Sequence, residues 1–139
     1  QSACAGKGVY ATQAAEVLAT MGGEVRGRYS VVGLKPDLIW KCQGTAAFIN
    51  REARFDAAAF APETAAPLDS LRALLAECRI DMPEGLPAIA AGLFGYLGSD
   101  MIRLVEHLPD VNPDPLGLPD AVLMRPSVVA VAVSKLLAQ

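Results

Sequence analysis

The strand-like segment from Arg26 to Ser30 has a concentration of polar side chains on an otherwise apolar scaffold. In an extended chain alternate residues face the same side, so Arg26, Arg28 and Ser30 share one face. Two guanidinium groups at this spacing could hold a carboxylate through paired hydrogen bonds. The alternative is a solvated sheet face that carries surface arginines. The segment therefore predicts either a carboxylate site or an ordinary exposed strand.

No other set of side chains in the sequence indicates catalysis or metal binding. The chain has one histidine, His107, and no G-x-S-x-G motif around any serine, so a hydrolase triad is not predicted. Its three cysteines, Cys4, Cys42 and Cys78, are odd in number, far apart and free of the CxxC spacing that marks zinc sites. We expect no catalytic and no metal-binding residues, and reduced thiols as in a cytoplasmic protein.

Composition narrows the class of protein further. The 139 residues are 53% hydrophobic and 19% charged, with a net charge of −3, and the mean hydropathy is +0.33. Charged residues usually make up about 25% of a globular chain, so either the core is large or apolar surface meets a partner. The acidic balance argues against nucleic acid as a partner. The longest uncharged apolar stretches, Leu86–Ser99 and Pro126–Ser134, are shorter than the ~20 residues of a membrane span.

Strand patterns surround the polar segment. Alternating residues predict strands over 26–32 and 37–42, joined by a turn at Gly33–Asp37, which is dense in turn-forming residues. A hairpin at Gln43-Gly44 leads to a third strand over 45–50. These elements predict a three-stranded antiparallel meander. Its second strand places Leu38, Trp40 and Cys42 on one face.

Three segments have helical spacing of apolar residues. Pro67–Arg79 is the clearest, because Pro67 suits a first helical turn and its leucines form one face. Tyr10–Met21 predicts a helix that ends at a glycine pair, with an edge strand over 16–20 as the alternative. Asp100 is predicted to cap a helix that runs through Glu106.

The remaining segments are apolar runs and connections. Leu86–Leu97 has no charge, which predicts a central strand buried on both faces. Its glycines, spaced by three, indicate close backbone packing or a bulge, with a nearby ligand as the alternative. A final strand is predicted over 121–133, interrupted at Pro126, and a proline-rich loop over 109–119. The segment 51–66 is predicted to be a connector with one helical turn near Asp56–Phe60.

Together these patterns predict an α+β fold. It consists mainly of antiparallel β-sheet, formed by the N-terminal meander and two later strands, with two or three packed helices. The length of 139 residues corresponds to a single domain.

Three runs of residues resemble the N-terminal region of anthranilate synthase component I, of the alphaproteobacterial type. The resemblance extends from about Gly22 to Val131, so the ends 1–21 and 132–139 are divergent. The order and spacing match in all three runs, which read GGEVRGRYSVVGLKPDLIW at 22–40, AAGLFGYLG with Asp100 at 90–100, and NPDPLGLPD at 112–120.

The resemblance implies both a fold and a function. Enzymes of this family convert chorismate and an amino group from glutamine to anthranilate, with Mg²⁺, in tryptophan biosynthesis. Their N-terminal region forms an antiparallel α+β structure, has the feedback site for tryptophan and packs against the chorismate-binding half. The family's chorismate and Mg²⁺ residues lie beyond the matched stretch, which implies that this chain has no cofactor and no activity alone.

Residues for a tryptophan-type site carry over in part. Arg28, Tyr29 and Ser30 match the family's ligand-side strand, with Gly95 and Tyr96 as structural neighbours. The family has Leu-Leu-Glu-Ser before the glycine pair, and its Glu and Ser hold tryptophan. At that spacing this chain has Leu18 and Ala19, so we expect an impaired tryptophan site. It also has Ser99 where the family has tyrosine.

Three functional hypotheses follow from the sequence. The first is a cytoplasmic, non-catalytic regulatory or interface domain of an anthranilate synthase large subunit, with a possible small amino-acid ligand. The second is a self-associating structural fragment, or an engineered scaffold, with no ligand. The third is one piece of an enzyme that needs its catalytic half in trans. The expected partner is accordingly either a further copy of the chain or the catalytic half, and not nucleic acid or membrane.

Overall fold

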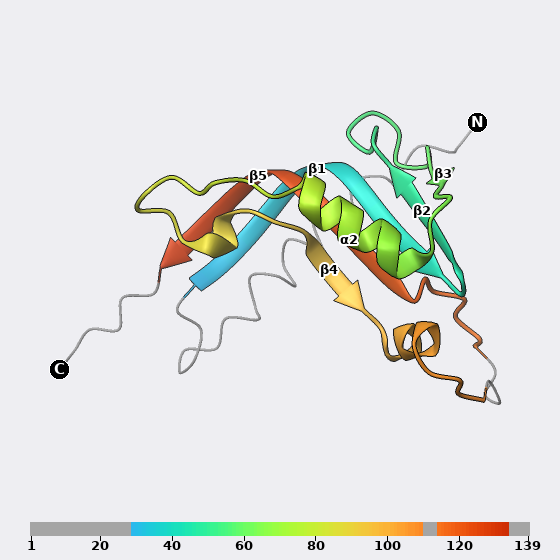
Figure 1. Cartoon of the computed structure of the whole chain (residues 1–139). Helices are drawn as coiled ribbons and strands as arrows, with labels where there is room; N and C mark the ends of the chain where they lie inside the picture. Colours follow the sequence, from blue (N-terminus) through green and yellow to red (C-terminus); the bar gives the residue numbers. More distant parts are fainter. Residues whose placement is uncertain (1–28, 110–113, 134–139) are drawn as a thin grey trace. The chain divides into compact units, whose positions relative to one another are not determined.

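A single five-stranded sheet dominates the structure. The computed structural model describes residues 29–109 and 114–133 (Figure 1). The strands lie in the order β3-β2-β1-β5-β4, and their bounds are Tyr29–Gln43 for β1, Ala46–Asn50 for β2, Ala61–Pro62 for β3, Phe94–Leu97 for β4 and Ala121–Val133 for β5. The described residues form two compact units, a smaller one with residues 29–35, 82–91 and 127–133, and a larger one with 36–81, 92–109 and 114–126.

The larger unit is built on the β1–β2 hairpin. The two strands are antiparallel, with register from Ile39 opposite Asn50 to Gln43 opposite Ala46. Gly44 takes a φ of +56° in the connecting turn, a conformation that glycine adopts without steric cost. The predicted inward face of β1 is confirmed, since its members are all fully buried in the core (Leu38, Trp40, Cys42).

One α-helix, α2 (Pro67–Glu77), packs on this part of the sheet (Figure 1). It confirms the predicted helix and ends two residues earlier than expected. Proline stands at its start and Asp69 in its first turn, where a negative charge complements the helix dipole. Leu71 and Leu74 are buried against the sheet, whereas Leu75 is exposed. The buried stripe is therefore narrower than the leucine pattern suggested.

The predicted turn at Gly33–Asp37 is wrong, because β1 runs through it without reversal. Lys35 takes a φ of +52°, so one left-handed residue accommodates the Gly and Pro within a continuous strand. The hydroxyl of Ser127 in β5 donates to the Lys35 carbonyl at 2.7 Å. The predicted three-stranded meander is thus a hairpin whose first strand is long.

The predicted central strand over 86–97 is also wrong. Only Phe94–Leu97 forms a strand, β4, and a 3₁₀ helix, η1, covers Ala88–Ala90. In the strand order β4 lies at one edge of the sheet, and it pairs with β5 from Phe94 opposite Met124 to Leu97 opposite Ala121. An uninterrupted apolar run therefore does not mark a buried strand here.

β5 continues through Pro126, contrary to the expected interruption. The pairing with β4 ends at Met124, so the missing amide hydrogen of proline falls beyond that ladder. The predicted helical turn near 56–60 is absent from the described connector, which instead contains the two-residue strand β3, paired with β2.

The described residues contain fewer helices than expected. The segment after β4 forms a 3₁₀ helix, η2 (Ser99–Leu104), in place of a helix through Glu106, and α2 is the one α-helix of the described ranges. The expected helix over 10–21 lies outside them. Residues 114–119 have no regular structure, in agreement with the predicted loop. The mainly antiparallel α+β class is confirmed.

Candidate functional site

The three residues predicted to bind a ligand lie at the beginning of β1. Tyr29 and Ser30 are the first two residues of the strand, where the structure describes the backbone only. Arg28 lies just outside the described residues. Their predicted role in a tryptophan-type site therefore stays a prediction.

Gly95 and Tyr96, the expected neighbours of that site, have structural roles in β4. A Cβ atom on Gly95 would lie 1.9 Å from the carbonyl oxygen of Val122, so only glycine allows the two strands to approach this closely. Tyr96 donates its hydroxyl hydrogen to the carbonyl of Pro119 at 2.8 Å. Of the two interpretations of the spaced glycines, close backbone packing explains Gly95.

A buried polar chain joins α2 to the sheet. The indole Nε1 of Trp40 donates to Ser70 Oγ at 2.9 Å, and Ser70 Oγ donates to Glu63 Oε2 at 3.0 Å. Trp40 and Ser70 are both buried, so these bonds satisfy groups that would otherwise be costly to remove from water. The chain of bonds fixes the position of α2 rather than offering a free catalytic group.

Arg125 forms an ion pair that no sequence pattern predicted. Its Nε and Nη2 donate to the two carboxylate oxygens of Asp37 at 2.9 and 3.0 Å, and its Nη1 lies 3.6 Å from Cys78 Sγ. The hydrogen bonds from Arg125 lower the pKa of Asp37 below its usual range. Because both oxygens of Asp37 occupy the guanidinium fork, a carboxylate ligand would have to displace Asp37. The two residues are far apart in sequence, and no motif connects them.

A second two-point ion pair lies between the end of β2 and α2. Arg51 Nη1 and Nη2 donate to the carboxylate of Glu77 at 2.6 and 2.8 Å. These bonds lower the pKa of Glu77. Both side chains are about half exposed, so the pair contributes little to stability.

Asp120 connects three segments of the larger unit. Its carboxylate accepts from the Gly44 amide at 2.6 Å, and its carbonyl accepts from the Gly98 amide at 2.7 Å. The β1–β2 turn and the end of β4 are thereby held to the start of β5. Burial, and secondarily the charge of Asp120, raise the pKa of the Cys42 thiol. Cys42 is accordingly a buried, unreactive thiol.

Two features are absent from the described residues. No group of three or more His, Cys, Asp or Glu side chains there is placed to hold a metal ion. No helix within the same ranges is long and apolar enough to cross a bilayer.

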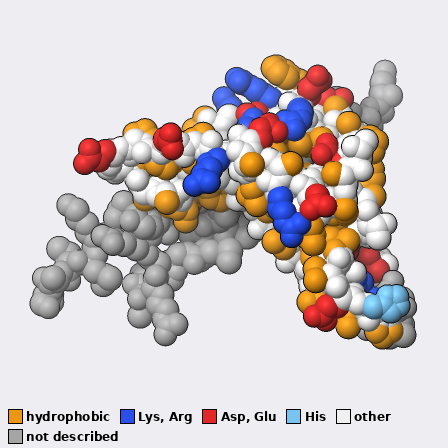
Figure 2. Space-filling model, in the orientation of Figure 1, with side chains coloured by type: hydrophobic (Ala, Val, Ile, Leu, Met, Phe, Trp, Pro, Cys, Tyr) orange, Lys and Arg blue, Asp and Glu red, His pale blue; other side chains and the backbone are white. Residues whose placement is uncertain are grey.

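Apolar side chains are exposed in one stretch of the larger unit. We call this stretch the β4–η2 surface, and Figure 2 shows apolar side chains over β4 and η2. Its members have exposed fractions between 43% and 75% (Tyr96, Leu97, Ile102, Val105, Leu108, Leu116, Leu118). Groups of exposed apolar residues commonly mark a site of protein contact. The β4–η2 surface is therefore the candidate contact site among the described residues.

Comparison with known proteins finds similarity to one kind of enzyme subunit. The chain is 76% identical over 110 residues to anthranilate synthase component 1 of Cereibacter sphaeroides, which covers 79% of this chain and 22% of that protein. It is 35% identical over 116 residues to the protein of the same name from Pseudomonas aeruginosa, again 79% of this chain and 22% of the relative. No family model matches the sequence.

A solved structure shares the fold of this chain. Anthranilate synthase component I from Streptococcus pneumoniae superimposes with a TM-score of 0.62 at 21% identity, over 81% of this chain and 23% of that one. The resemblance expected from the sequence is confirmed: the chain is similar to the N-terminal region of anthranilate synthase component 1. It spans about a fifth of the length of the relatives that it matches.

Proposed function

We propose that this chain acts as a non-catalytic regulatory and interface region of an anthranilate synthase large subunit, in cytoplasmic tryptophan biosynthesis. The identity of 76% over 110 residues to the Cereibacter sphaeroides protein supports this proposal most directly. The proposal assigns the conversion of chorismate, and the Mg²⁺ that the family uses, to parts of the complete enzyme outside the matched residues.

Two arginine–carboxylate pairs of the larger unit fit a non-catalytic role. Arg125 is bound to Asp37 and Arg51 to Glu77, so these four side chains are paired within the fold instead of meeting a substrate. Tyr96 and Asp120 hold β4, β5 and the hairpin turn in a fixed arrangement. A region of this kind presents a rigid surface to the rest of an enzyme.

A hybrid enzyme tests the proposal. The 110 matched residues of full-length Cereibacter sphaeroides component 1 are replaced by those of this chain, and anthranilate formation from chorismate and ammonia is measured. We expect the hybrid to retain activity within about tenfold of the parent, and the 139-residue chain alone to have none. An inactive hybrid, or anthranilate formation by the isolated chain, would contradict the proposal.

The regulatory part of the proposal depends on Arg28, Tyr29 and Ser30 as a tryptophan-type site, which the substitutions Leu18 and Ala19 impair. Isothermal titration of the full chain with tryptophan measures this. We expect binding only at millimolar tryptophan, because two polar contacts of the family site are replaced by apolar side chains. Micromolar affinity would refute the impairment, and no heat at millimolar ligand would remove the sensor role.

Self-association is the alternative function, and the exposed β4–η2 surface favours it. Under this alternative the chain is a structural fragment whose apolar face pairs with a second copy. Sedimentation of the full chain across a range of concentrations distinguishes the two, since a strict monomer at high concentration is incompatible with self-association.

A further inference from the structure

The exposed apolar residues of the larger unit are distributed unevenly. Of its ten large hydrophobic residues that are exposed within the described ranges, seven lie in the 23 positions from Tyr96 to Leu118. The other three, Phe55, Leu75 and Ile80, are separated along the chain. Single exposed hydrophobic residues are ordinary, whereas a group of seven on one short stretch calls for a partner.

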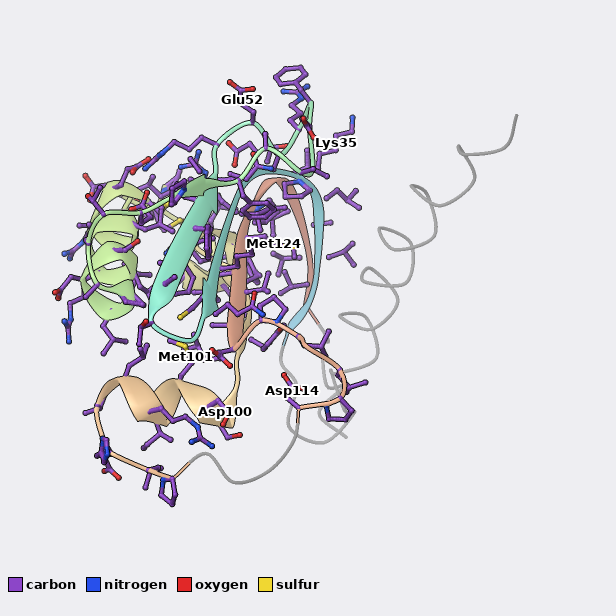
Figure 3. All side chains as sticks on the ribbon, turned by 90° about the vertical axis from the view of Figure 1, so that its right-hand side faces the viewer. Lys35, Glu52, Asp100, Met101, Asp114 and Met124 are labelled. Carbon is purple, nitrogen blue, oxygen red and sulfur yellow. The ribbon has the colours of Figure 1, made fainter. Side chains whose placement is uncertain are left out.

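The η2 helix has apolar side chains on two sides. Met101 and Leu104 pack against the core cluster, and Figure 3 shows Met101 pointing from η2 toward the sheet. Ile102 in η2 and Val105, the residue directly after the helix, are exposed, Val105 by 73%. The inward pair is sufficient to dock the helix on its own unit. The outward pair therefore has no contact among the described residues that would explain its apolar character.

Several hydrogen bonds hold this surface in one geometry. Tyr96 Oη donates to the Pro119 carbonyl, and the Gly98 amide donates to the Asp120 carbonyl. Arg103 pairs with Asp100 at 3.0 Å, and its Nη1 donates to the carbonyls at positions 108 and 109 at 3.3 and 3.0 Å. A preformed apolar surface binds a partner with little ordering cost.

We propose that the β4–η2 surface is the face on which this chain docks against the remaining part of an anthranilate synthase component 1 polypeptide. This inference rests on the proposed function. The matched stretch is 22% of the Cereibacter sphaeroides protein, so more than three quarters of that protein lies outside the match and is available to cover this surface. The occupant is an apolar face, because the one charged pair on η2, Asp100 with Arg103, is neutralised internally.

The test compares two exposed apolar positions. Val105→Asp changes the β4–η2 surface, and Phe55→Asp changes a residue that is 88% exposed and lies outside it. Each substitution is made in the 139-residue chain and in the hybrid enzyme described above. Leu118→Asp is a second variant on the surface, in the loop that precedes β5.

In the hybrid we expect Val105→Asp and Leu118→Asp to lower the thermal midpoint by about 5 °C or more, because a buried interface does not accept an unpaired charge. Phe55→Asp should leave the midpoint within about 1 °C of the hybrid. Amides at 102–105 should exchange hydrogen more slowly in the hybrid than in the 139-residue chain, and amides near Phe55 equally fast in both.

The outcomes separate the inference from the proposed function. An inactive, unfolded hybrid without any substitution contradicts both. An active hybrid in which Val105→Asp and Leu118→Asp behave like Phe55→Asp overturns the docking surface alone. If the surface variants destabilise the 139-residue chain itself, its own other segments cover the surface. If the surface variants abolish self-association of the 139-residue chain and leave the hybrid unaffected, a second copy of the chain covers the surface. Either result also overturns the inference.

Discussion

Removing the hydroxyl of Ser70 tests whether the buried polar chain fixes α2 on the sheet. Ser70 Oγ accepts a hydrogen bond from Trp40 Nε1 at 2.9 Å and donates one to Glu63 at 3.0 Å. In Ser70→Ala the indole N–H stays buried with no acceptor, since Trp40 is fully enclosed by the core. The Glu63 carboxylate is partly exposed and can turn to water, so the main loss is at Trp40.

The magnitude follows from two opposing effects. A buried donor without a partner costs about 1–3 kcal/mol. Alanine in α2 regains about 0.5 kcal/mol of helix propensity over serine. The expected net loss of unfolding free energy is about 0.5–2.5 kcal/mol, which for a chain of this length lowers the midpoint by roughly 3–5 °C per kcal/mol.

A double-mutant cycle with Trp40→Phe isolates the bond. Urea unfolding followed by circular dichroism gives the free energies of the parent, both single variants and the double variant. We expect a coupling of about 1 kcal/mol between positions 40 and 70. Ser99→Ala, at an exposed position of η2, is the control and should stay within about 0.5 kcal/mol of the parent. A coupling near zero, or an unchanged Ser70→Ala, would refute the role of this bond.

Three further changes have defined outcomes in the same unfolding assay. Gly95→Ala should cost about 1–3 kcal/mol or more, since the added methyl would lie 1.9 Å from the Val122 carbonyl oxygen, and an unchanged stability would contradict the close approach. Lys35→Gly should stabilise the chain by about 0.5–1 kcal/mol, because glycine removes the cost of a φ of +52°; a loss of stability would argue against that conformation. The pKa of Asp37 is lowered by Arg125, so the pair stabilises the fold above the unfolded pKa of about 3.9 and loses this contribution as the pH falls through the folded pKa. Asp37→Asn should therefore cost up to about 1 kcal/mol near neutral pH, a modest figure because the Asp37 and Arg125 side chains are 38% and 36% exposed. The cost should shrink as the pH falls below the unfolded pKa, and a cost that does not change with pH would exclude the ion pair as its source.

Sequence patterns predicted an element correctly where several local signals indicated the same structure. In Pro67–Glu77 a proline start, an acidic first turn and helical leucine spacing all indicate the same structure, and the helix forms. The alternation of Leu38, Trp40 and Cys42 likewise identified the inward face of β1. Period-two and helical patterns succeed where one face is buried and the other is not.

The failures occurred where local signals had to compete with strand pairing. Gly33 and Pro36 are turn formers, yet β1 continues because a single left-handed residue, Lys35, absorbs the irregularity and its carbonyl is bonded by Ser127. Pro126 is tolerated because the β4 ladder ends before it. Lys35 and Ser127 are 92 positions apart in sequence, and paired residues of β4 and β5 are 24 to 30 apart, so patterns among neighbouring residues do not reveal these contacts. The Arg125–Asp37 pair was missed for the same reason.

The wrong prediction of a buried central strand over Leu86–Leu97 bears on how the exposed apolar residues are interpreted. The absence of charge predicted that this segment is buried inside the chain's own sheet. That prediction failed because β4 is an edge strand and its residues Tyr96 and Leu97 are exposed. The low charged fraction of the chain, 19%, can be explained in two ways: by a large core, or by apolar surface that a partner covers. The exposed apolar residues of the β4–η2 surface favour the second of these, a covered surface, which is the premise of the docking proposal.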